Sequence, residues 1–484
     1  MSRRTAAAAA LLAAVALASG AGSSGPPVFP LSQVRPGLTG HGLSVFAGTE
    51  PRRFEVEVVG VLERAAPGTS YILARLAGEG LERTGVIAGM SGSPVYLDGR
   101  LAGAVAFAFP FAKEALAGIT PVESMRAIPA AAGAASGAMG GSASAATPLV
   151  ALADLAAERW PADLLERSLA PLAAAAGGPE PGRPGILWAA AGWPAGARGR
   201  REAAGLAAAG LSGSRGAAAP IVPGSAAAAL LVDGDFQLAA TGTVTEREGD
   251  TLLAFGHPLF GLGPVSLPLA GAEVIAVVPS QSVSFKLANV GPVAGAWTVD
   301  HAAGVRGQVG RAAPQLPVTI EVRPDGAAAA APLALRVAEH PLFTPGLTAL
   351  GLLGALDLAG AAVAQSVDLE LLFRLAEGPP LAMRQSFDGP GAGSEALLWQ
   401  LALHSYLALN PLAPVRVAAL EVRAAAFGEP RGATVIAAHP ERTVVRPGER
   451  LGVEVVLSPH RRPVERRRLE LALPADLPPG RYPL

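Results

Sequence analysis

The sequence predicts a mainly β protein with two barrel-sized β units, followed by a C-terminal β-sandwich-like domain that carries a few helices. Three observations favour this fold class. Short runs of apolar and β-branched residues recur at close spacing along most of the chain. Turns rich in glycine, several of the Asp-Gly type, separate these runs. Two longer apolar runs of helical character, 347–359 and 395–409, lie in the last third of the chain.

Composition limits the classes of partner and cofactor. A length of 484 residues corresponds to about three domains. The formal net charge of -1 argues against nucleic acid or an anionic surface as the main partner. No histidine or carboxylate cluster has the spacing of a metal site, and no glycine-rich phosphate loop predicts a nucleotide cofactor. We therefore expect neither a metal nor a cofactor.

The N-terminus has the pattern of a secretory signal peptide over residues 1–22. Arg3 and Arg4 precede an apolar run from Ala6 to Ala18, which ends in a small-residue cleavage pattern. The sequence thus predicts export to the periplasm or the extracellular space, with no membrane span after signal cleavage. The chain has no cysteine, so neither a disulfide nor a lipid-modified cysteine is expected. Nothing in the sequence indicates the oligomeric state.

The first β unit is expected over residues 31–126. Phe54–Leu62 alternates apolar and polar residues, which is the period of a half-buried strand. Further strands are predicted at 71–76, 86–88, 95–97, 101–109 and 119–122. Asp98-Gly99 predicts a hairpin turn between two of them. Strands this short and this closely spaced indicate a small barrel.

A connector rich in Ala, Gly and Pro is expected over residues 127–219, with short helices at 161–169 and 195–209 and a strand near 186–189. The second β unit is expected over residues 220–322. Its predicted strands lie at 227–232, 236–244, 251–255, 274–278, 283–287, 305–309 and 318–322. This series is again the size of a barrel.

The C-terminal β-rich domain is expected over residues 323–484. Leu347–Ala359 and Glu395–Leu409 predict apolar helices. Strands are predicted at 333–337, 415–422, 433–438, 443–445, 451–457 and 469–473. Because the chain stops where another strand would begin, we expect this domain to be truncated.

The strongest motif is Gly89-Met90-Ser91-Gly92-Ser93-Pro94, a tight turn of small residues between two apolar runs. Glycines around Ser91 allow a sharp turn and leave room for a substrate carbonyl. The backbone N–H groups of Gly89 and Ser91 can then converge as an oxyanion hole. Gly-x-Ser-Gly-x-Pro is the nucleophile turn of trypsin-like serine peptidases. Since a serine hydroxyl is a weak nucleophile, this interpretation also requires a base.

Two of the seven histidines are candidate bases. His257 follows an apolar strand in Phe255-Gly256-His257-Pro258, and His41 lies in the same β unit as Ser91. Either one can instead be an ordinary turn histidine that is satisfied by a backbone carbonyl. The other five are expected to be surface or packing residues: His301, His340, His404, His439 and His460.

Two segments carry a resemblance to a known family. The segment 54–125, including the Ser91 turn and Asp98-Gly99, resembles the peptidase domain of SpoIVB, the sporulation stage IV serine peptidase. Leu253–His257 is similar to the histidine motif of that family. The resemblance implies a trypsin-like two-lobe β-barrel core. It also implies Ser91 as nucleophile, His257 as base, and a protein or peptide of the cell envelope as substrate.

Two of the departures from the family pattern concern the candidate site. The family has histidine before serine, so the two lobes here are expected in permuted order. The place where the family aspartate is expected holds Leu76–Gly78, and the nearest carboxylates, Glu79 and Glu82, are the possible third members. A backbone carbonyl could orient His257 instead. The alternative function is therefore a non-catalytic envelope protein that keeps the peptidase fold as a binding or scaffolding surface.

Overall fold

The computed structural model describes residues 25–66, 69–130, 187–191, 211–212, 216–326, 331–361, 363–410 and 412–482. The mainly β fold class is confirmed, since strands far outnumber helices in this part of the chain. The signal peptide expected over residues 1–22 lies outside the described residues. So do the helices predicted at 161–169 and 195–209.

Six strands form a closed antiparallel barrel in the order β1-β2-β3-β6-β5-β4. They are β1 (Thr39–Ser44), β2 (Arg52–Ala66), β3 (Thr69–Ala77), β4 (Pro94–Leu97), β5 (Arg100–Ala108) and β6 (Leu116–Pro121). Three short helices border it, namely η1 (Leu31–Gln33), α2 (Leu81–Thr84) and α3 (Val122–Arg126). We refer to this unit as the serine barrel.

The alternation in β2 explains which side of the strand faces inward. Phe54, Val56 and Val58 are buried, whereas the intervening Glu55 and Glu57 are exposed. The apolar side chains fill the barrel, and the hydrophobic effect thereby sets the register of the strand. The strand predicted at 86–88 was wrong: this segment makes one isolated bridge, from Ala88 to Phe285, and the rest is irregular chain.

A second group of six strands also closes on itself. Its members are β9 (Ala226–Gly234), β10 (Gln237–Glu248), β11 (Thr251–Ala254), β12 (Gly263–Val278), β13 (Phe285–His301) and β14 (Gly304–Val309). The antiparallel pairings run β9-β10-β11-β14-β13-β12 and return from β12 to β9. Trp297 is fully buried and donates a hydrogen bond to the Ala228 carbonyl (3.0 Å). We refer to this unit as the histidine barrel.

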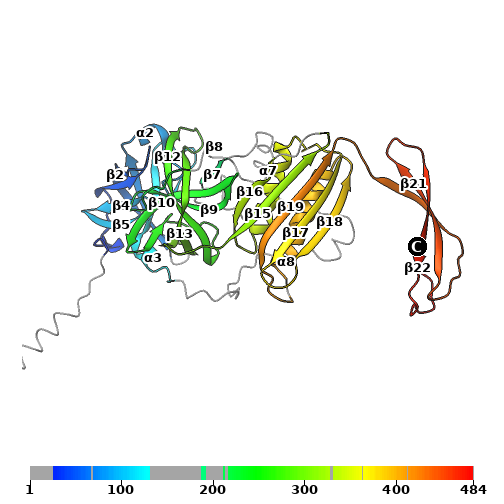
Figure 1. Cartoon of the computed structure of the whole chain (residues 1–484). Coiled ribbons are helices and arrows are strands. Elements are labelled where there is room, and N and C mark those ends of the chain that lie inside the picture. The colour runs from blue at the N-terminus through cyan, green and yellow to red at the C-terminus, as the bar shows by residue number, and fades with distance from the viewer. Residues whose placement is uncertain are drawn as a thin grey trace, which may run out of the picture.

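The two barrels have the same circular topology. With the strands of each numbered one to six in chain order, both follow the order 1-2-3-6-5-4. Ser91 lies between the third and fourth strands of its barrel, and His257 lies between the third and fourth strands of the other. Figure 1 shows both barrels at one end of the molecule. Paired β-barrels are also the scaffold of chymotrypsin-like enzymes.

Further strands extend the sheet of the histidine barrel. At one side β10 pairs with β7 (Leu187–Ala191), close to the strand expected near 186–189, and β7 pairs with β8 (Leu211–Ser212). At the other side β9 pairs with β16, and the sheet continues in the order β16-β15-β19-β17-β18. These strands are β15 (Gln315–Pro324), β16 (Leu333–Ala338), β17 (Ser366–Leu375), β18 (Leu381–Asp388) and β19 (Val417–Phe427).

The C-terminal sheet is covered by two helices, α7 (Thr344–Leu358) and α8 (Ala392–Ala408), close to the predicted helical segments. The C-terminal sheet is therefore not half of a sandwich of two sheets, as expected. Its partner layer consists of α7 and α8 (Figure 1). Nearly every residue of α7 is buried, so its apolar surface supplies the second layer. Strands β17 and β18 were absent from the sequence prediction.

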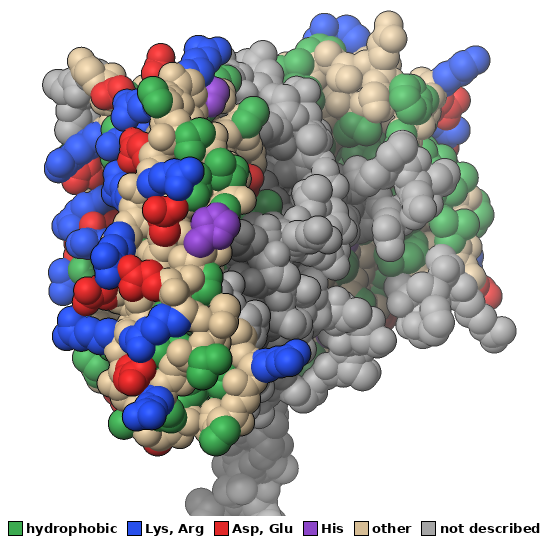
Figure 2. Space-filling model, turned by 90° about the vertical axis from the view of Figure 1, so that its right-hand side faces the viewer, with side chains coloured by type: hydrophobic (Ala, Val, Ile, Leu, Met, Phe, Trp, Pro, Cys, Tyr) green, Lys and Arg blue, Asp and Glu red, His purple; other side chains and the backbone are tan. Residues whose placement is uncertain are grey.

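The last three strands form a separate antiparallel sheet in the order β20-β21-β22, at the far end of the molecule in Figure 1. They are β20 (Ala433–Pro440), β21 (Arg450–Pro459) and β22 (Glu465–Ala472). The strand predicted at 443–445 was wrong, since these residues lie in the loop after β20. Figure 2 shows acidic and basic side chains interspersed over this end. None of the helices in the described ranges is both long and apolar enough to span a membrane.

Candidate active site

The Ser91 turn is the loop that leads into β4. Gly89 and Gly92 both adopt positive φ (96° and 93°), a backbone conformation that glycine reaches without steric cost. Three N–H groups of the turn are used: Met90 donates to Ile87 O, Gly92 to Val105 O and Ser93 to Met90 O. Within the described ranges, the N–H groups of Gly89 and Ser91 donate to no acceptor. These are the two N–H groups expected to form the oxyanion hole.

Strand β10 of the histidine barrel holds this turn by its carbonyl groups. Thr243 N–H donates to Ser91 O (2.7 Å), and the Thr243 hydroxyl donates to Gly89 O (2.9 Å). The Thr245 hydroxyl donates to Gly92 O (2.7 Å). All three carbonyl groups therefore point toward the second barrel. Both threonine side chains are completely buried, so these hydrogen bonds do not compete with bulk water.

Gly92 brings the two candidate segments together. A Cβ atom at this position would lie 2.0 Å from Thr243 O and 2.4 Å from Phe255 N. Real side chains never approach backbone atoms so closely, so only glycine fits after Ser91. The Ser91 turn consequently packs directly on the backbone that leads to His257, two residues beyond Phe255.

The His257 ring is oriented by the carbonyl group of the next residue. Its Nδ1 lies 2.7 Å from Pro258 O, and because a carbonyl oxygen only accepts, the contact assigns the proton to Nδ1. The other nitrogen, Nε2, then carries a lone pair. It is buried and has no hydrogen-bond partner among the described residues. A neutral imidazole with a free Nε2 is the form that a general base requires.

The chain around His257 is bent sharply. Phe255 and Gly256 both have φ of 67°, and for the buried Phe255 this is an unfavourable backbone conformation. The Phe255 ring packs against Trp297 (5.3 Å between centroids) and against the His257 ring (6.2 Å). From the serine barrel, the Thr120 hydroxyl donates to Gly256 O (2.6 Å). Contacts from both barrels thus fix the bend.

Asp300 holds the loop that follows His257. Its carboxylate accepts hydrogen bonds from the N–H groups of Leu259 (2.7 Å), Phe260 (2.7 Å) and Leu262 (3.3 Å). Burial raises the pKa of the Asp300 carboxyl, while these N–H donors act in the opposite direction. The sequence prediction missed Asp300, although it is the only acidic residue at the end of β13, next to the turn into β14.

Ser91 and His257 are not hydrogen-bonded to each other. Ser91 is partly exposed, and its hydroxyl has no hydrogen-bond partner in the part of the chain that the structure describes. His257 is only 2% exposed, and burial lowers its pKa to about 4. The two residues thus lie on adjoining segments, and the serine is partly exposed whereas the imidazole is buried.

The alternative base His41 lies on β1. Its ring stacks on Tyr96 (5.2 Å between centroids), and it makes no hydrogen bond with Ser91. Burial, followed by the nearby charge of Arg53, lowers the pKa of His41. This stacked position is typical of a packing residue on the barrel wall.

The possible third members, Glu79 and Glu82, are engaged elsewhere. Glu79 forms an ion pair with Arg52 (3.5 Å), and Glu82 accepts a hydrogen bond from Gly78 N–H (2.7 Å). The structure records no contact of either carboxylate with His257. The Nδ1–H group of His257 donates its hydrogen bond to Pro258 O.

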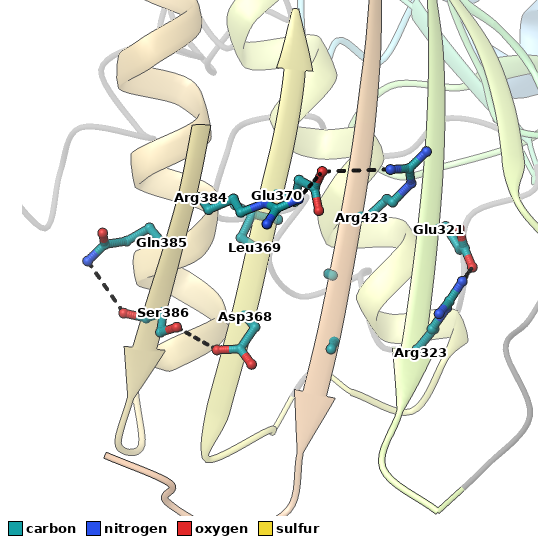
Figure 3. Close-up of a pocket in the computed structure, with 11 residues that line it drawn as sticks. Glu321, Arg323, Asp368, Leu369, Glu370, Arg384, Gln385, Ser386 and Arg423 are labelled. Atoms are coloured by element: carbon teal, nitrogen blue, oxygen red, sulfur yellow. Dashed lines mark hydrogen bonds and ion pairs between the residues drawn. The ribbon is translucent and has the colours of Figure 1, made fainter. Parts of the chain in front are cut away.

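A hollow in the structure lies away from these residues, on the outer face of the C-terminal sheet (Figure 3). Charged side chains of β15, β17, β18 and β19 line it and pair with one another. Glu370, for example, lies between Arg384 (3.2 Å) and Arg423 (3.7 Å). Neither the Ser91 turn nor the His257 loop contributes to this hollow.

Comparison with known proteins gives one match. Residues 26–122 match the family described as SpoIVB peptidase S55. The matched segment contains the whole serine barrel and the Ser91 turn, and it ends before β9 and His257. The resemblance to SpoIVB-type serine peptidases is therefore confirmed over this segment. No protein of curated function and no solved structure matches the chain.

Proposed function

We propose that the protein is a serine endopeptidase of the SpoIVB type, with Ser91 as nucleophile and His257 as general base. The observation that carries this proposal is the Gly92 contact. It packs a serine turn with two free N–H groups against the segment that ends in an imidazole with a free Nε2. Nucleophile, base and oxyanion donors are the groups that acyl transfer needs.

In the proposed reaction, His257 Nε2 takes the proton of Ser91 as the Ser91 oxygen attacks the scissile carbonyl carbon. The N–H groups of Gly89 and Ser91 bind the resulting oxyanion. The imidazolium then gives its proton to the departing amine. Water hydrolyses the acyl-enzyme by the same steps and restores the serine. Pro258 O stabilises the imidazolium through Nδ1–H in the place of a carboxylate.

In this chain the serine precedes the histidine, the reverse of the family order. This order is compatible with the site, because a catalytic site depends on geometry and not on the order of its residues in the chain. Both barrels have the same strand order, with Ser91 and His257 in equivalent loops. We therefore infer that the lobes are permuted relative to the family. The substrate would be a protein or peptide of the cell envelope, reached after export by the signal peptide at residues 1–22.

The test is covalent labelling of the purified protein with a fluorophosphonate probe. Wild type should be labelled, Ser91→Ala should not, and His257→Ala should be labelled at least about a hundredfold more slowly. Ser282→Ala and His439→Ala, which change exposed residues, serve as matched controls. Loss of labelling in His41→Ala but not in His257→Ala would overturn the choice of base.

The second candidate function is the non-catalytic binding or scaffold protein. The observation in its favour is that, among the described residues, Pro258 O and no carboxylate is the hydrogen-bond partner of His257. An unlabelled wild type, folded and with Ser91 accessible to a small probe, would support this function. Hydrolysis of a denatured protein substrate that depends on Ser91 would reject it.

A further inference from the structure

Lys286 is a buried lysine at the start of β13, and the reaction proposed above does not use it. It is one of only two lysines in the chain, and it is 3% exposed. Its backbone N–H donates to Ala88 O (3.2 Å), while Ala88 N–H donates to Ser284 O (2.8 Å). The start of β13 is thereby paired with the chain just before the Ser91 turn.

The side chain of Lys286 reaches the other end of the same turn. Its Nζ lies 2.9 Å from Ser44 Oγ, and Ser93 Oγ donates a hydrogen bond to Ser44 Oγ (3.0 Å). Ser44 and Ser93 are both completely buried. Ser93 is two residues beyond Ser91 and is the last residue before β4. Lys286 therefore contacts the entry of the turn through its backbone, and its amine is linked to the exit through Ser44.

We propose that Lys286 is a positioning residue for Ser91, acting through the Lys286–Ser44–Ser93 chain of hydrogen bonds. The proposal rests on the proposed function, because it concerns the same turn. The N–H groups of Gly89 and Ser91 can bind an oxyanion only if the turn keeps its shape, and Lys286 holds it at both ends. Small displacements of such groups reduce reaction rates by about a hundredfold.

The surroundings of Nζ favour a neutral amine. The groups near it are the Ser44 hydroxyl and the Phe46 ring (5.9 Å), with Val277 of β12 opposite Lys286 in the sheet. No charged group of β1, β12 or the segment before Ser91 shifts this pKa. Burial alone lowers it to about 7. Since no carboxylate among the described residues pairs with the buried amine, the charged form is costly there.

The state of the amine also decides the direction of the hydrogen bonds. Ser44 Oγ already accepts from Ser93, so the Ser44 hydroxyl proton needs an acceptor of its own. Lys286 Nζ donates to Ser44 Oγ in the structure (2.9 Å), and at this distance a neutral amine can instead accept the Ser44 proton through its lone pair. An ammonium group has no lone pair and would force Ser44 to turn its proton toward Ser93. Protonation of Lys286 therefore disturbs the exit of the turn.

The test uses the scarcity of lysine and methionine in this chain. In protein labelled with ¹³C and ¹⁵N at lysine, NMR should show two side chains: exposed Lys113 as reference, and Lys286 titrating near pH 7. The methyl signal of buried Met90, inside the turn, should shift with the same midpoint. In Ser44→Ala, Lys286 should still titrate near pH 7, but Met90 should no longer respond.

Reactivity gives a second readout. The rate of fluorophosphonate labelling at Ser91 should rise as Lys286 loses its proton. In Lys286→Leu this rise with pH should be absent, and the probe should label Ser91 about ten- to a hundredfold more slowly. Lys113→Leu should be labelled at the wild-type rate. A Lys286 signal that does not change near pH 7, or a Met90 signal that does not follow Lys286, would overturn the inference. Absence of labelling in wild type would instead reject the proposed function, while the NMR titrations still decide the role of Lys286.

Discussion

Gly92 and Phe255 are in backbone contact across the two barrels, so that a Cβ on Gly92 would lie 2.4 Å from Phe255 N. The residue after the candidate nucleophile and the residue two before the candidate base therefore depend on each other. Any change that separates the barrels at this point also separates Ser91 from His257.

Gly92→Ala should disrupt this contact. The new methyl group would meet Thr243 O and Phe255 N, and alanine at a φ of 93° is strained as well. We expect the free energy of unfolding to fall by about 1–3 kcal/mol and labelling of Ser91 to be lost. Denaturant unfolding and probe labelling measure the two effects. Gly60→Ala, at a position with open space around it, should leave both unchanged.

Thr245→Val should weaken the hold of β10 on the turn. Valine keeps the shape but removes the hydroxyl that donates to Gly92 O, leaving this carbonyl group without that donor. The expected loss of stability is about 1–3 kcal/mol, with slower labelling of Ser91. Thr434→Val, on exposed β20, is the matched control. Equal stability of the two variants would show that the Thr245 hydrogen bond contributes little.

Asp300→Asn should loosen the loop after His257. An amide keeps one oxygen but turns an NH₂ group toward N–H groups that now donate to a carboxylate. Since hydrogen bonds to charged groups are the stronger ones, stability should fall by about 2 kcal/mol. Labelling should slow in parallel, because the His257 ring loses its fixed orientation. Exposed Asp476→Asn should behave as wild type.

The labelling rate should show an acid limb set by His257. Its pKa lies at about 4, so the imidazole stays neutral and able to accept a proton down to that pH. In Lys286→Leu, which lacks the step proposed for Lys286 near pH 7, activity should therefore be lost as the pH falls through about 4 and not near 6.5. Rates measured between pH 3.5 and 6.5, with circular dichroism to monitor folding, test this. A midpoint near 6.5 would mean that the imidazole is hydrated in solution.

Acid should also destabilise the fold through buried histidines. Burial lowers the pKa of His340 and His404 to about 4, and the neutral His404 ring hydrogen-bonds with Thr348. In each case the unfolded chain binds a proton at a higher pH than the native one does. The free energy of unfolding should thus decrease as the pH falls from about 6.5 to 4, by about 3 kcal/mol per histidine.

Denaturant unfolding at a series of pH values measures this effect. The free energy of unfolding should change less steeply with pH in His404→Gln, because glutamine does not bind a proton in this range. Glutamine also retains hydrogen-bonding groups at this buried position. His439→Gln, at an exposed position of β20, should keep the wild-type slope. An unchanged slope in His404→Gln would show that His404 is not neutral in the native protein.

Local patterns were enough for part of the fold. The alternation in β2 and the apolar runs of α7 and α8 predicted those elements near their observed positions. Strands β12 and β13 proved much longer than expected, since their middle parts are rich in Ala and Gly and lack the usual strand residues. These residues become strands because neighbouring strands pair with them on both sides.

The sequence by itself predicted the Ser91 turn and its two N–H groups, and it favoured His257 over His41 as candidate base. These depend on residues close together in the chain, whose glycines and spacing limit the backbone. Only the tertiary structure decided three sets of hydrogen bonds. They join β10 to the Ser91 turn, Asp300 to the loop after His257, and Lys286 to Ser44. Such contacts join residues 40 to more than 200 positions apart. Their partners are set by how two barrels pack, and no local pattern records that packing.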